Sequence, residues 1–121
     1  MQGTFSIEID RFNGILEHKG SGFWTLDTVD AFLAAEREAI ASLDVEVQDL
    51  LILFDATDLA VQQREVIDRL RQPENPLYRA RRAAFVTPRG LGMMQIRRGT
   101  PDAHIGVFET VSEARRYLTS D

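Results

Sequence analysis

Five consecutive apolar residues, Leu50–Phe54, are the clearest feature of the hydrophobic pattern, and they lie between Asp49 and Asp55. A run this short and this apolar is typical of a strand that is buried on both faces in the middle of a parallel sheet. We therefore predict a central strand here. Asp55 is expected where the strand ends and the chain turns, which is the edge of an open α/β sheet where ligands bind.

Two strands are predicted before this run. Residues Phe5–Asp10 alternate between apolar and polar side chains with period two, as in a strand that is buried on one face. Asn13-Gly14 is a strong hairpin signal, and Ile15–His18 follow as the second strand. The glycines of Gly20–Gly22 break the pattern. The first two strands are thus expected to be antiparallel neighbours.

Four segments have the spacing of amphipathic helices, and two more strands lie between them. The first helix is expected to begin near Thr25 or Asp27 and to reach Leu43, with Glu36 on its polar outer face. The later helices are predicted at Val61–Leu70, at Leu91–Arg98 and after the capping box Thr110–Glu113, and the later strands at Arg82–Thr87 and His104–Phe108.

The predicted order is β-β-α-β-α-β-α-β-α. Strands that alternate with helices require crossover connections and a largely parallel sheet, and the first hairpin makes that sheet mixed. We therefore predict an α/β fold with a mixed, mostly parallel five-stranded sheet flanked by about four helices. A length of 121 residues without a long linker predicts a single domain over residues 1–121.

Composition narrows the class of protein. The chain has no cysteine and no apolar run near the ~20 residues that cross a membrane, so we expect a cytoplasmic protein without stable membrane insertion. Residues 1–60 carry three basic and 12 acidic side chains, whereas residues 61–121 carry 11 and seven. The net charge of −5 and the lack of a nucleic-acid module argue against nucleic acid as a partner.

The layout resembles the small SpoIIAA-like proteins, which are relatives of the STAS domains of anti-sigma-factor antagonists. The residues that carry the resemblance are the hairpin start, the glycine turn Gly20–Gly22, the buried strand ending in Asp55, the AAFVTP strand at Ala83–Pro88 and the VFETVSEARRYL finish at Val107–Leu118. The resemblance implies a non-enzymatic regulatory or ligand-binding role and often a homodimer.

Two phosphorylation mechanisms do not fit the residues. The antagonists have an Asp-Ser-Ser-Gly type sequence after the central strand, whereas this chain has Asp58-Leu59-Ala60-Val61-Gln62, so a phosphoserine switch is not expected. Asp55 and Thr87 stand like the phosphoacceptor and threonine of a receiver domain. The only lysine is Lys19, however, and the acidic pair that holds magnesium in receivers is missing.

Six residues are candidates for contact with a ligand or partner. Asp55, Thr57 and Arg89 would supply polar contacts at the loops after the central strands. Trp24, Met93 and Met94 would supply apolar contacts, since methionine and aromatic side chains line adaptable pockets and dimer faces. The alternative is that the apolar residues only complete the core and that Asp55 accepts backbone amides in a turn.

Three functions remain open on these residues. The first is a non-catalytic module that binds a partner, itself or a small amphipathic ligand. The second is a small enzyme or anion-binding protein that uses Asp55, Thr57 and Arg89. The third is a pure interaction subunit with the apolar residues at a two-fold interface. No metal or cofactor is expected, because His18 and His104 have no second ligand at metal-binding spacing.

Overall fold

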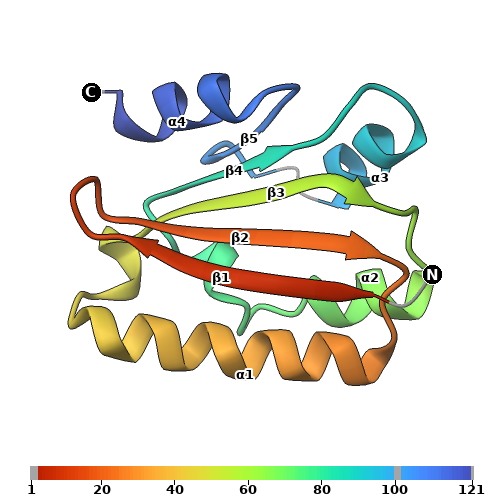
Figure 1. Ribbon diagram of the computed structural model, residues 1–121, viewed down its shortest axis with the longest axis horizontal. Coiled ribbons are helices and arrows are strands. Elements are labelled where there is room, and N and C mark those ends of the chain that lie inside the picture. The colour runs from red at the N-terminus through yellow and green to blue at the C-terminus, as the bar shows by residue number, and fades with distance from the viewer. Residues whose placement is uncertain (1–2, 100–101, 121) are drawn as a thin grey trace.

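The computed structural model describes residues 3–99 and 102–120, and it contains one five-stranded sheet with four α-helices (Figure 1). The strands are β1 (Thr4–Asp10), β2 (Ile15–Gly22), β3 (Leu51–Leu59), β4 (Arg82–Val86) and β5 (Ile105–Phe108). The α-helices are α1 (Leu26–Leu43), α2 (Arg64–Leu70), α3 (Leu91–Gly99) and α4 (Val111–Thr119), and the 3-10 helices are η1 (Val47–Asp49) and η2 (Pro76–Tyr78).

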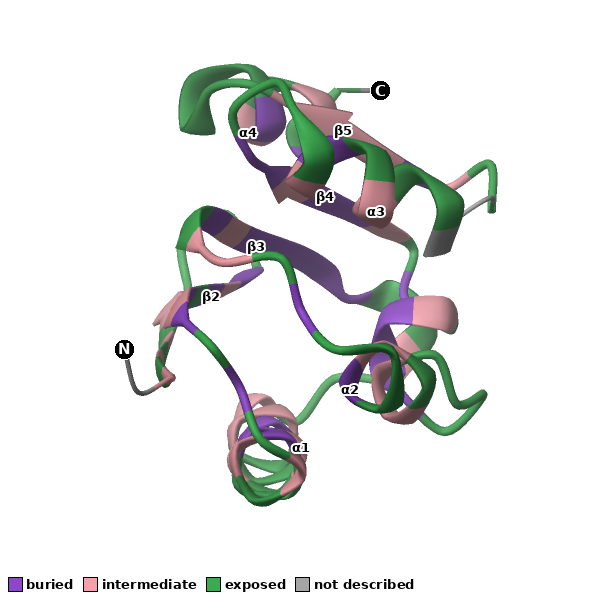
Figure 2. Cartoon of the chain, turned by 90° about the vertical axis from the view of Figure 1, so that its right-hand side faces the viewer, coloured by how far each residue is buried: buried purple, intermediate pink, exposed green. Residues whose placement is uncertain are grey.

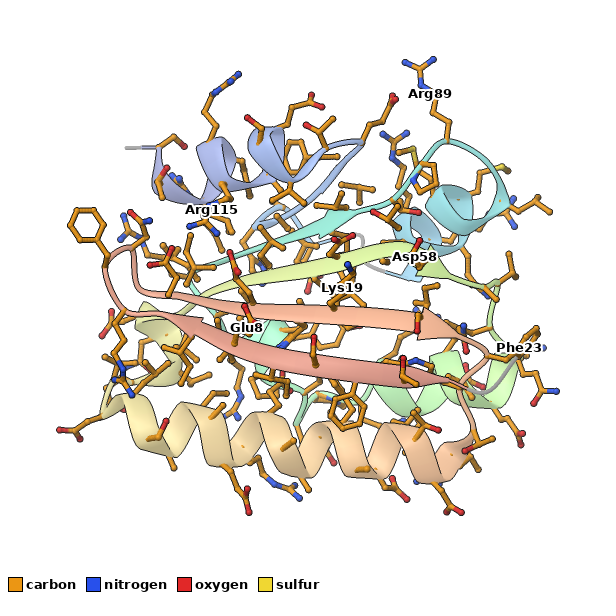
Figure 3. The ribbon with its side chains drawn as sticks, in the orientation of Figure 1. Glu8, Lys19, Phe23, Asp58, Arg89 and Arg115 are labelled. Carbon is orange, nitrogen blue, oxygen red and sulfur yellow. The ribbon has the colours of Figure 1, made fainter. Side chains whose placement is uncertain are left out.

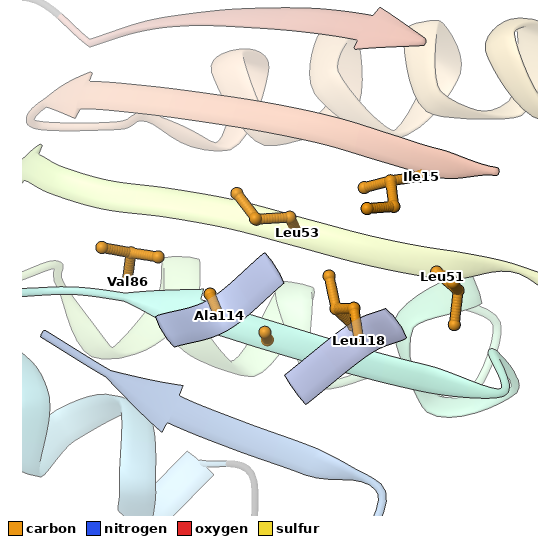
Figure 4. Close-up of a cluster of buried hydrophobic side chains, with 7 residues drawn as sticks. Ile15, Leu51, Leu53, Val86, Ala114 and Leu118 are labelled. Atoms are coloured by element: carbon orange, nitrogen blue, oxygen red, sulfur yellow. The ribbon is translucent and has the colours of Figure 1, made fainter. Parts of the chain in front are cut away.

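The sheet has the order β1-β2-β3-β4-β5, with β1 antiparallel to β2 and the other neighbours parallel. The predicted mixed, mostly parallel sheet is therefore confirmed, and β3 is its central strand. The side chains of Leu51 and Leu53 pack with Ala114 and Leu118 of α4 (Figure 4). Ile52 faces the opposite layer, so the central apolar run is buried on both faces.

The helices divide unequally between the two faces of the sheet. α1 and α2 lie on one face, and α4 lies on the other (Figure 2). Ile96 of α3 packs against the cluster that contains Phe32 of α1 and Val66 of α2. α4 packs mainly against β3, β4 and β5, and its Arg115 forms ion pairs with Asp10 of β1 and Glu17 of β2. One face of the sheet therefore carries three helices and a thick apolar layer.

Three predicted boundaries are wrong, the first being that of β2, which does not end at His18 but continues to Gly22. β3 does not end before Asp55 but continues to Leu59, because β2 also continues beyond a bulge and pairs Ser21 with Asp58. α2 begins at Arg64 rather than at Val61. Backbone amides in the intervening loop bond to other parts of the chain: Ala60 donates to the Gly22 carbonyl and Gln62 to the Gln95 side chain.

Thr25 and Thr110 cap the helices that follow them, as predicted. The Thr25 hydroxyl accepts the amide of Thr28, and the Thr110 hydroxyl accepts the amide of Glu113 at 3.1 Å. In a capping box the Glu113 carboxylate would accept the Thr110 backbone amide, whereas here it accepts the Thr110 hydroxyl at 3.0 Å. Among the described residues, no helix is long and apolar enough to cross a membrane.

Candidate functional site

Asp55 and Thr57 form a local pair on β3. One carboxylate oxygen of Asp55 accepts the Thr57 amide at 3.0 Å and the Thr57 hydroxyl at 2.5 Å. Asp55 also lines a hollow with Glu8 and Lys19, two residues that Figure 3 labels on β1 and β2. The Asp55 carboxylate thus already holds two hydrogen-bond donors from its own strand.

Arg89 lies apart from that pair. It is an exposed side chain in the turn between β4 and α3, and its Nε donates to Glu109 at 2.6 Å. Within residues 3–99 and 102–120, no hydrogen bond or ion pair joins Arg89 to Asp55 or Thr57. The three predicted polar contacts therefore do not meet in one cluster, and their role in binding stays a prediction.

The three apolar candidates occupy different environments. Trp24 is 2% exposed and packs its ring against Phe32 and Phe54, with centroids 5.2 Å and 6.0 Å apart. Met93 is buried and Met94 is half exposed. The structure thus places Trp24 and Met93 inside and leaves Met94 at the surface; contact with a ligand or partner stays a prediction for all three.

A cavity of about 100 Å³ lies between the sheet and the three helices on its thicker side. Ile52, Phe54 and Phe85 form its floor on the sheet, and Phe32 of α1 and Ile67 of α2 form part of its wall. The remaining wall comes from the loop after β3, from η2 and from α3. None of the six residues predicted as contacts is among the residues that line it.

Buried polar side chains collect around this apolar cavity. Five polar or charged side chains are buried in residues 3–99 and 102–120, and all five line it: His18, Glu36, Gln62, Asn75 and Thr87. A buried polar group is destabilising unless it is hydrogen-bonded, and the Thr87 hydroxyl donates to the Pro88 carbonyl at 3.4 Å.

Two of the five hold the surrounding loops together. The Gln62 side chain accepts the Trp24 amide at 2.8 Å and donates to the Gly22 carbonyl at 3.0 Å. The Asn75 side chain accepts the Leu77 amide and donates to the Leu70 carbonyl. Both side chains are well satisfied, so their role is to fix the backbone that forms the cavity wall.

His18 and Glu36 are different because each retains an unpaired polar atom. His18 Nε2 and Glu36 Oε2 are 2.6 Å apart, and the two residues are 2% and 1% exposed. The other atoms of the two groups, His18 Nδ1 and Glu36 Oε1, have no hydrogen-bond partner among the described residues. The rings of Phe32 and Phe54 pack edge-on against the imidazole, at 4.9 Å and 5.9 Å.

A surface groove between α2 and α3 adjoins the cavity. Three residues, Ile67, Arg71 and Gln95, line both the groove and the cavity, so the groove marks the mouth. Its outer walls are formed by exposed apolar side chains together with a second arginine: Val61, Leu91, Met94 and Arg98. An apolar interior with two arginines at its opening is the arrangement expected for an amphipathic molecule.

Tyr78 of η2 also contributes to the wall. Burial raises the pKa of its phenol.

Sequence reasoning missed the His18–Glu36 pair, and the prediction that Glu36 lies on the outer face of α1 is wrong. The signal was present, because Glu36 follows Phe32 by four residues and precedes Ile40 by four, which places it on the inward face. His18 belongs to β2 rather than to α1, and only the fold brings the two side chains together.

No protein-family model and no curated protein matches the chain. A solved structure from Shewanella loihica PV-4 is similar to it: an uncharacterized protein from the DUF3478 family with a SpoIIAA-like fold. The similarity covers 97% of this chain and 94% of that chain, with 18% sequence identity and a TM-score of 0.71. The resemblance expected from the sequence is thus confirmed at the level of architecture: this chain has the SpoIIAA-like fold.

Proposed function

We propose that this protein is a non-catalytic regulatory module that binds a small amphipathic ligand in the cavity between the sheet and α1, α2 and α3. The observation that carries the proposal is the apolar cavity itself, which shares Ile67, Arg71 and Gln95 with a surface groove. A ligand enters through the groove and places its apolar body against Phe54 and Phe85.

Burial of apolar surface supplies the binding free energy for the apolar part of the ligand. The lining of the cavity is mostly apolar, and a ligand group that fills it removes that apolar surface from water. An engineered apolar cavity of roughly 150 Å³ binds benzene, so a space of about 100 Å³ holds at most one aromatic ring or a short alkyl chain, and the rest of the ligand lies in the groove. Filling the space restores the contacts that its lining side chains lack.

The mouth favours an anionic end group on the ligand. Arg71 and Arg98 are exposed at the groove, and a guanidinium pairs with a carboxylate through two parallel hydrogen bonds. The ligand class that fits is therefore a small carboxylate with an apolar body. Association with a protein partner or as a homodimer, and location in the cytoplasm, stay predictions, as does the alternative of catalysis at Asp55, Thr57 and Arg89.

The test is to titrate the protein with 3-phenylpropanoate by calorimetry and by thermal unfolding. A Cβ at Gly92 would meet only the Thr87 hydroxyl at 3.6 Å, an ordinary contact, so Gly92→Leu places a side chain in the cavity. Wild type is expected to bind and to melt at a higher temperature with ligand, and Gly92→Leu is expected to lose both effects.

Ala34→Leu, at an exposed position on α1, is the matched control and should behave as wild type. Equal binding by Gly92→Leu, or no binding by wild type, would contradict the proposal.

A further inference from the structure

We infer that the His18–Glu36 pair is the inner recognition element of the cavity and that it selects a ligand with a neutral hydrogen-bond donor, a phenolic hydroxyl, at the end opposite its carboxylate. The inference rests on the proposed function and adds the class of ligand: a hydroxyaryl carboxylate. Both residues line the cavity, and each has an unpaired buried atom.

The chemistry of the pair fixes what it can accept. Glu36 Oε2 already bonds to His18 Nε2 at 2.6 Å, as either a carboxylate oxygen or a protonated one. When Glu36 is ionised, or carries its proton on Oε2, its Oε1 has no proton and acts as an acceptor. The unpaired oxygen therefore needs a donor from whatever occupies the cavity.

A hydroxyl meets this need better than a charged group does. A ligand carboxylate at this depth would face another acceptor, and a buried charge is strongly disfavoured without a full set of partners. A phenolic O–H donates to Glu36 Oε1, and its oxygen can also accept from His18 Nδ1 in the tautomers that carry a proton there. Its aromatic ring matches the surrounding rings of Phe32 and Phe54.

The two ends of the site thus have opposite requirements. The inner end holds the buried acceptor Glu36 Oε1, which a ligand hydroxyl reaches only by packing directly against it, whereas the mouth presents the cationic side chains Arg71 and Arg98. This polarity orients the ligand with its hydroxyl inward and its carboxylate outward. It also predicts discrimination, because a ligand without the hydroxyl leaves the buried groups unpaired.

The experiment compares 3-(4-hydroxyphenyl)propanoate with 3-phenylpropanoate, which differ only by the hydroxyl. Wild type is expected to bind the hydroxylated probe about 10-fold more tightly or better, since a buried acceptor left without a donor weakens binding by about that factor. The double variant His18→Phe/Glu36→Leu keeps an apolar wall and removes both unpaired atoms. It is expected to lose the preference while it still binds 3-phenylpropanoate.

Glu36→Gln serves as a second variant that retains the shape of the wall, and we expect it to reduce the preference. Equal affinities in wild type would overturn the inference and leave the proposed function intact, as would a preference that survives in the double variant. A water molecule held by Glu36 Oε1 is one way to obtain equal affinities. Failure of wild type to bind either probe would overturn both the inference and the proposed function.

Discussion

Gln62 and Gln95 bind each other through two reciprocal hydrogen bonds that join the loop after β3 to α3. The backbone amide of Gln62 donates to Gln95 Oε1 at 3.2 Å, and Gln95 Nε2 donates to the backbone carbonyl of Gln62 at 3.0 Å. Gln95 also lines both the cavity and the groove. This one side chain therefore fixes the position of α3 relative to the mouth of the site.

Replacing Gln95 with alanine is expected to loosen the mouth. Gln95→Ala leaves the backbone amide and backbone carbonyl of Gln62 without their partner, which should lower the free energy of unfolding by about 1–2 kcal/mol. Hydrogen exchange at the Gln62 amide should become faster, because its acceptor is gone. Gln72→Ala, which removes an exposed glutamine bonded to the Asp68 carbonyl, is the control. Unchanged exchange at Gln62 would contradict this account.

Replacing one residue of the His18–Glu36 pair should destabilise the protein more than replacing both. Glu36→Leu leaves His18 buried without its partner and should lower the free energy of unfolding by about 3 kcal/mol. His18→Phe/Glu36→Leu should lie within ~1 kcal/mol of wild type, because neither buried polar group remains. Urea denaturation of His18→Phe, of Glu36→Leu and of the double variant gives the three free-energy changes of a double-mutant cycle.

The control for this cycle is Glu38→Leu, at an exposed position on the same helix. A double variant that is as unstable as the sum of the two single variants would contradict the expected coupling.

Two glycines should respond to alanine in opposite directions. At Gly20 a Cβ would lie 3.0 Å from Trp24 Cζ2 and 3.1 Å from Phe54 Cζ, so Gly20→Ala should crowd the aromatic cluster and destabilise by about 1–3 kcal/mol. At Gly92 the nearest atom is 3.6 Å away, and the residue is helical, so Gly92→Ala should stabilise by up to ~1 kcal/mol. Thermal unfolding of both variants checks the contrast, and a shift of the same sign in both would contradict it.

The N-terminal hairpin should make stability sensitive to acid. Hydrogen bonds from the side chain and backbone of Asn13, together with Arg115 of α4, lower the pKa of Asp10 to about 2 from 3.8. The Asp10 carboxyl is protonated at a lower pH in the folded protein than in the unfolded chain. Its interactions therefore contribute to the free energy of unfolding above pH ~4, and this contribution is lost as the pH falls toward 2. Asp10→Asn should reduce the change in the free energy of unfolding between pH ~4 and pH ~2.

Urea midpoints between pH 2 and pH 6 measure this effect. Glu38→Gln is a control at an exposed carboxylate and should retain the slope of wild type. An unchanged slope in Asp10→Asn would contradict the assignment.

Local spacing was enough to predict the architecture. The run Leu50–Phe54 alternates its faces in a strand, and both faces are apolar, so it had to lie between two layers, as it does in β3. The same holds for the helices, whose inward stripes return every 3.6 residues. These features depend on neighbours along the chain, which a sequence displays directly.

The position of the candidate site was decided by tertiary structure. Glu36 and His18 are 18 residues apart, and Gln62 and Gln95 are 33 apart, so no local pattern joins them. Hydrophobic packing brings α1, α2 and α3 onto one face of the sheet, and imperfect packing among them leaves the cavity. The spacing of apolar residues predicts which of them point inward, whereas the gaps between elements depend on how whole elements pack together.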